Sequence, residues 1–175
     1  RVHVAADGTL DTVTDLRAGR QVLPAGSRAN VLQLHPDLPN RFDAWDIDAF
    51  YRNRSRDLDA VDSLETRQHD DGSASVTVVR TIGASRFEQV TRLAPGERAV
   101  ELRTDVDWQE RESLLKVAFP VDVHADRSTS EVQFGHVHRA THTNTSWDAA
   151  RFEIPAHRWL HVTEPGYGVA LVNER

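Results

Sequence analysis

Hydrophobic and polar residues alternate with a period of two along most of the chain, and helical periodicity is nearly absent. A period of two is typical of β-strands that bury one face and leave the other in water. Val, Thr and Ile, whose branched side chains favour strands, together supply 36 of the residues. The pattern therefore predicts a protein built from short strands.

Three turn sequences divide these strands into predicted hairpins. A glycine after Asp supplies the positive φ that a two-residue hairpin loop requires. Pro120 indicates a sheet edge or a bulge, because proline cannot donate to a strand ladder. The turns are Asp7-Gly8, Asp70-Asp71-Gly72 and Ala94-Pro95-Gly96; the predicted strands cover 2–4, 10–16, 61–69, 73–82, 86–93, 97–108, 115–123, 131–138, 151–162 and 167–173.

Nine or ten strands separated by turns, with no helix long enough to connect parallel neighbours, predict an all-β fold. The expected architecture is an antiparallel β-sandwich. No internal repeat and no low-complexity tract interrupts the chain, so we expect a single domain over residues 1–175. A chain of this length can remove about 70% of its unfolded surface from water, which is enough for a hydrophobic core.

Composition excludes several functional classes. With no cysteine there is no disulfide, no thiolate metal site and no cysteine nucleophile. A net charge of −6 argues against nucleic acid as a partner, and no apolar run approaches the roughly 18 to 20 residues of a membrane helix. Methionine is absent even from position 1, so we expect the chain to be an interior piece of a longer protein.

Two stretches, 33–58 and 141–150, are too long for simple hairpin links, and long loops on a rigid sheet often carry function. Residues 37–52 hold four carboxylates and four aromatic rings. This mixture suits a carbohydrate, because aromatic faces pack on sugar C–H groups and carboxylates accept hydrogen bonds from hydroxyls. Two alternatives are that the rings Phe42, Trp45 and Phe50 cap the sandwich, and that Asp43, Asp46 and Asp48 bind calcium without the Gly and Glu of an EF-hand loop.

Histidines are concentrated in the last third of the chain. His136 and His138, at i and i+2 of a predicted strand, project from one face, where a third ligand would complete a zinc site. The alternative is that these are solvated or core histidines. His157 and His161 are expected on the outer face of their strand, opposite the apolar positions.

In residues 141–148, seven of eight side chains are polar or charged. Such a loop either satisfies itself through local turns or faces a polar ligand. Ser146, His142 and Asp148 have the side chains of a hydrolase triad, but no G-x-S-x-G elbow is present to position a nucleophile.

The loops as a set resemble the C-terminal β-sandwich region of glycoside hydrolase family 38 α-mannosidases, most closely the bacterial and cytosolic-type members. The resemblance covers nearly the whole chain in the right order. It implies a supersandwich similar to that of galactose mutarotase, and a cytoplasmic protein. The segments that carry it include Asn30-Val31-Leu32-Gln33-Leu34, Asp43-Ala44-Trp45-Asp46, Asn144-Thr145-Ser146-Trp147-Asp148, Ala156-His157-Arg158-Trp159 and Gly166-Tyr167-Gly168-Val169-Ala170-Leu171.

The resemblance implies a parent enzyme that removes terminal non-reducing α-D-mannose with retention of configuration. In that family an aspartate nucleophile, a carboxylic general acid and a zinc ion lie in an N-terminal domain, and none of those motifs is present here. We therefore expect no catalytic residue, metal ligand or cofactor in this piece, and no activity of the piece alone. The implied sugar-proximal residues are Asp43, Trp45 and Asp46 first, and then His142, Asn144, Trp147 and Asp148.

The implied partners are a mannose-containing oligosaccharide and the parent's own catalytic and helical domains, with neither nucleic acid nor membrane. Surface that normally docks on those domains is expected to favour homo-oligomers in isolation. Two other functions stay open: a free-standing carbohydrate-binding module, and a zinc enzyme built on His136 and His138.

Overall fold

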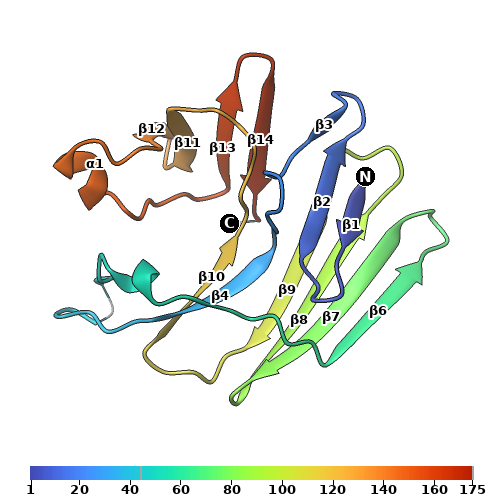
Figure 1. Ribbon diagram of the computed structural model, residues 1–175, viewed down its shortest axis with the longest axis horizontal. Helices are drawn as coiled ribbons and strands as arrows, with labels where there is room; N and C mark the ends of the chain where they lie inside the picture. Colours follow the sequence, from blue (N-terminus) through green and yellow to red (C-terminus); the bar gives the residue numbers. More distant parts are fainter. Residues whose placement is uncertain (44, 175) are drawn as a thin grey trace. The chain divides into compact units, whose positions relative to one another are not determined.

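The computed structural model describes residues 1–43 and 45–174. Within these residues the strands form four antiparallel sheets, so the predicted all-β, antiparallel class is confirmed (Figure 1). The chain divides into two compact units, residues 1–120 and 121–175. None of the described helices is long and apolar enough to cross a membrane.

The first unit holds three sheets. One has the order β6-β7-β8-β9, the second β1-β2-β3 and the third β10-β4-β5. Their bounds are β1 Val2–Val4, β2 Leu10–Asp15, β3 Arg20–Gln21, β4 Val31–Pro36, β5 Arg56–Asp57, β6 Ser63–Gln68, β7 Ala74–Ile82, β8 Ser85–Leu93, β9 Glu101–Asp107 and β10 Ser113–Ala118, with a 3-10 turn, η1, at Tyr51–Asn53.

The two small sheets of this unit share a layer that covers the four-stranded sheet. A bridge between Leu10 and Ala29, with backbone N···O distances of 2.9 and 2.8 Å, joins the small sheets. Two apolar clusters fill the space between the layers: Leu10, Leu23 and Ala29 with Leu102, and Leu32, Leu58 and Phe87 with Leu34, Ile82, Trp108 and Leu115.

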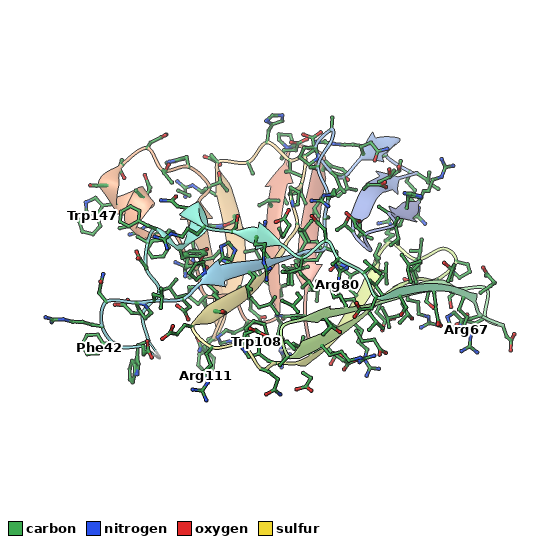
Figure 2. The ribbon with its side chains drawn as sticks, turned by 60° about the horizontal axis from the view of Figure 1, so that its bottom comes forward. Phe42, Arg67, Arg80, Trp108, Arg111 and Trp147 are labelled. Atoms are coloured by element: carbon green, nitrogen blue, oxygen red, sulfur yellow. The ribbon has the colours of Figure 1, made fainter. Side chains whose placement is uncertain are left out.

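A charged side chain also lies between the layers. Arg80 of β7 is only 1% exposed, and its guanidinium donates to the carbonyl oxygens of Leu58 and Asp7, the latter at 3.0 Å (Figure 2). Leu58 follows β5, and Asp7 lies in the β1–β2 turn. Arg80 therefore ties the four-stranded sheet to both parts of the opposite layer.

The hairpins predicted at Asp7-Gly8 and Asp70-Asp71-Gly72 are present, but their loops have three residues. In the first, the Gly8 N–H donates to the Ala5 carbonyl at 2.8 Å, and Gly8 takes a φ of 76°. Glycine is favoured there because it is the last loop residue, in the left-handed region. The expected two-residue loop is wrong, because Ala5 and Thr9 form the closing pair.

The second unit holds one four-stranded sheet and a short helix. The sheet has the order β12-β11-β13-β14, and all three pairings are antiparallel. The bounds are β11 Arg127–Val132, β12 Gly135–Ala140, β13 Trp159–Glu164 and β14 Tyr167–Val172, with α1 at Ser146–Ala150.

Several predicted strand bounds are wrong. The strand expected over 131–138 is a hairpin that turns at Gln133 and Phe134, where Phe134 takes a φ of 64°. The strand expected over 151–162 begins only at Trp159, and the one expected over 115–123 ends at Ala118, before Pro120. The stretch expected to be a loop from residue 33 is still β4 as far as Pro36, paired with β10.

Candidate functional site

The first predicted site loop leaves β4 and ends in an exposed turn. The backbone N–H groups of Trp45 and Asp46 donate to the Phe42 carbonyl at 2.7 and 3.0 Å, so Asp43, Trp45 and Asp46 share one turn. Phe42 takes a φ of 56°, and Figure 2 shows its ring pointing away from the strands. Trp45 is 90% exposed. Ala44, the second residue of the Asp-Ala-Trp-Asp motif, lies outside the described residues.

Both ends of this loop are fixed. At its start, the Asp37 N–H donates to the Glu112 carbonyl at 2.9 Å. At its end, Tyr51 is 5% exposed, its hydroxyl lies 2.6 Å from Lys116 Nζ, and its ring meets His35 edge-on at 5.0 Å between centroids. The loop therefore presents exposed rings on a base anchored to β4 and β10.

The alternative in which the loop rings cap the sandwich is wrong for this turn, since Phe42 is 70%, Trp45 90% and Phe50 71% exposed. The calcium alternative gains no support either. The Asp48 carboxylate accepts the Phe50 N–H at 3.0 Å, and among the described residues no group of three or more His, Asp or Glu is placed to hold a metal ion.

The second predicted site loop folds onto itself around the helix α1. Thr145 is the N-cap: its hydroxyl accepts the Asp148 N–H at 3.1 Å, and the Asp148 carboxylate accepts the Thr145 N–H and hydroxyl at 3.2 and 2.7 Å. This reciprocal pair is a capping box, which satisfies N–H groups that a helix start leaves without partners. The local-turn alternative therefore accounts for Thr145 and Asp148.

The charge of Asp148 is stabilised by the same contacts. The hydrogen bond from the Thr145 hydroxyl is the main cause of a lowered Asp148 pKa, and His142 and Arg151 lower it further. The Nδ1 atom of His142 lies 3.6 Å from the Asp148 carboxylate. In the hydrolase triad Asp148 would orient His142, but its shortest contacts are to Thr145 instead.

Replacing Thr145 with Val is expected to raise the pKa of Asp148 toward its ordinary value and to speed amide exchange in α1, with little effect on the sheet. A lowered pKa stabilises the fold above the ordinary Asp value, and this contribution is lost as the pH falls through the lowered value. An NMR pH titration of the Asp148 carboxyl measures the pKa, and amide hydrogen exchange measures the change in α1. Ser146→Ala is the matched control, and an unchanged pKa in Thr145→Val would assign the shift to the backbone N–H of residue 145, His142 and Arg151 instead of the hydroxyl.

The remaining predicted residues of this loop, Asn144 and Trp147, are exposed, Trp147 by 75%. Figure 2 shows the Trp147 ring beside the helix and directed outward. The structure thus brings Asp43, Trp45 and Asp46 together in the first unit. In the second unit it places His142 beside Asp148.

The histidines are arranged partly as predicted. His136 and His138 do share a face of β12, with ring centroids 5.1 Å apart, and Thr129 Oγ1 lies 2.9 Å from His138 Nδ1. No third ligand joins them within the described chain. His157 precedes β13 and donates its backbone N–H to Glu131, so it does not share a strand face with His161.

His161 is also less exposed than predicted. It is half-buried, its Nδ1 is shielded from solvent, and its ring stacks on Trp159 at 5.3 Å. The prediction failed because Trp159, two residues earlier on the same strand, shares the face of His161 and its ring covers the imidazole.

Sequence reasoning missed the residues that anchor the first loop. His35 and Tyr51 are both nearly buried, and Lys116 is the only lysine of the chain. In the pairing of β4 with β10, His35 lies opposite Leu114 and Lys116 opposite Gln33, and both side chains contact Tyr51. The alternation in 115–123 predicted a strand where β10 lies, but nothing in the sequence identifies β4 as its partner strand.

The antiparallel sheets place the chain in the class of all-β, sandwich-type proteins. The family model described as "Glycosyl hydrolases family 38 C-terminal domain" matches residues 1–175, and the chain belongs to this family. The chain is similar to alpha-mannosidase 2C1 of Homo sapiens (36% identical) and of Mus musculus (35%), each over 99% of this chain and 17% of the relative. It is 29% identical to alpha-mannosidase G of Dictyostelium discoideum, over 99% of this chain and 16% of the relative. The chain thus spans about a sixth of these relatives.

Proposed function

We propose that this chain is the β-sandwich region of a retaining α-mannosidase that hydrolyses terminal non-reducing α-D-mannose. Family membership and the relatives' names support this reading, together with the exposed Trp45 turn. In this proposal the nucleophile, the general acid and the zinc ion belong to other parts of the parent. The described residues of this chain offer no cage for a metal. We expect no turnover by the chain alone.

The proposed role of the chain is to form part of the sugar-binding wall. The Trp45 ring would pack against the C–H face of a mannose ring, and Asp43 and Asp46 would accept hydrogen bonds from its hydroxyls. The observation that carries this role is the 90% exposure of a tryptophan on a loop whose ends are fixed. Because both ends of the loop are fixed, the exposed Trp45 ring is already positioned for a ligand, and binding costs less conformational entropy of the loop.

Trp45→Ala in the full-length parent is expected to lower kcat/KM for an aryl α-mannoside about tenfold, a loss of about 1.4 kcal/mol in transition-state stabilisation. The melting temperature should stay close to that of the parent, because the exposed ring contributes little to packing. Steady-state kinetics and a thermal melt on the same preparation measure both.

Phe50→Ala is the matched control, because Phe50 is 71% exposed on the same loop but is not a predicted sugar contact. Its turnover should equal that of the parent. If both variants lose activity equally, or if the loss in Trp45→Ala follows a fall in melting temperature, the loop acts through packing against other parts of the parent and the sugar contact is refuted.

A further inference from the structure

A surface cleft in the first unit lies away from every residue predicted from the sequence. It encloses about 300 Å³ between residues 56–60 and the turn that joins β7 to β8. Leu58 and Ile82 are the large apolar residues of its lining, and both also pack in the cluster of Leu32 and Phe87. Its rim is polar: Arg56, Asp57, Asp59 and Thr81.

The carboxylates of the rim are held in place before any ligand arrives. Arg28 donates to Asp57 at 3.2 Å and to Asp59 at 2.9 Å, and Gln33 donates to the second oxygen of Asp57 at 2.9 Å. A carboxylate has about four acceptor positions, so each keeps acceptor capacity for a ligand. Asp59 is 54% exposed and therefore reachable from solvent.

Charge and size narrow the class of ligand. The carboxylates of Asp57 and Asp59 lie near the guanidinium groups of Arg28 and Arg56, and Arg28 also binds Asp7, so the net charge at the rim is small and slightly negative. An anion would meet Asp59 and a cation would meet Arg56, whereas neutral hydroxyl groups can donate to the carboxylates. A volume of about 300 Å³ lies at the small end of ligand sites, which suits one ring better than an extended chain.

We propose that this cleft binds a single pyranose ring of a neutral saccharide. The C–H face of the ring packs on Leu58 and Ile82, and its hydroxyls donate to Asp57 and Asp59. The proposal rests on the proposed carbohydrate function for the choice of sugar. It adds a binding site separate from the Trp45 turn, and no chemical step takes place in it.

The test is a titration of the 175-residue chain with methyl α-D-mannopyranoside, followed by saturation-transfer NMR and calorimetry. Wild type is expected to bind saturably with a millimolar Kd. Asp59→Asn should weaken binding about tenfold by removing the charged acceptor. Ala60→Phe, which places a ring in the cleft without removing a hydrogen bond, should abolish binding. Mannose 6-phosphate should bind more weakly than the neutral glycoside, because its charge meets the rim carboxylates.

Asp105→Asn is the matched control: Asp105 pairs with Arg103 at 3.0 Å, is 56% exposed and lies outside the cleft. It should bind like wild type. The proposal is overturned if wild type shows no saturable binding, or if Asp59→Asn and Ala60→Phe bind the glycoside as wild type does. If circular dichroism shows that Ala60→Phe is misfolded, the affinity of Asp59→Asn alone decides the test. The two proposals fail separately. If wild type does not bind the glycoside while the Trp45→Ala parent loses activity, only the cleft proposal is refuted. If wild type binds the glycoside while the Trp45→Ala parent keeps full activity, only the sugar contact of Trp45 is refuted.

Discussion

Arg80→Met is expected to lower the free energy of unfolding by about 3 kcal/mol, because two hydrogen bonds from a charged donor are lost at a buried site. Methionine keeps most of the side-chain length, so the effect isolates the guanidinium from the volume it fills. The carbonyl oxygens of Leu58 and Asp7 would remain between the layers without their donor. Each belongs to a different part of the opposite layer.

The opposite result, a gain in stability, is known for buried ion pairs replaced as a whole by apolar residues. Only one partner is removed here. Burial lowers the pKa of Arg80, and the carboxylates of Asp7, Asp59 and Asp62 raise it. The guanidinium still carries its charge, because arginine does not lose its proton in proteins. Those carboxylates would therefore lose a neighbouring cation as well.

Urea unfolding of the variant and of wild type at 25 °C measures the difference. Arg103→Met is the control, since Arg103 is 71% exposed and pairs with Asp105 at the surface. Its change should stay below about 0.5 kcal/mol. An Arg80→Met protein as stable as Arg103→Met would mean that the two carbonyl oxygens find water instead, and that Arg80 does not tie the layers.

Much of the fold could be predicted because hairpin strands are local. The Asp-Gly turns and the alternation on either side located β1 with β2, and β6 with β7. Strand bounds were predicted wrongly where no Asp-Gly or Pro-Gly turn sequence marked the end of a strand. Phe134 takes the left-handed conformation that glycine or asparagine usually occupies, so the hairpin between β11 and β12 was read as one strand.

The candidate site was predictable only in part. The Thr-x-x-Asp spacing at Thr145 and Asp148 resembles a capping box and was available in the sequence as a helix start. The Trp45 turn was located by composition and by the family resemblance. The cleft at Asp59 and the buried Arg80 depend on which distant strands face each other, and side-chain alternation within one strand does not encode that pairing.

Gly8→Ala is expected to destabilise the first unit by about 3 kcal/mol, the sum of a left-handed backbone penalty and an overpacking penalty. Gly8 takes a φ of 76°. A Cβ there would lie 2.7 Å from Arg80 Nη2 and 2.8 Å from a Val78 methyl carbon. Because Arg80 is held by Leu58 and Asp7, it cannot move aside without losing those bonds.

Gly19→Ala separates the two penalties, since Gly19 takes a φ of 63° and a Cβ there meets nothing within 4 Å. It should lose only about 1 kcal/mol, from the backbone alone. Urea unfolding of both variants gives the comparison, and equal losses would refute close packing of Arg80 on the turn. In the double variant Gly8→Ala with Arg80→Met, the combined loss of unfolding free energy should be smaller than the sum of the single losses. The smaller methionine end removes the nearest clash with the new Cβ, and the hydrogen bonds that this clash would disturb are already absent.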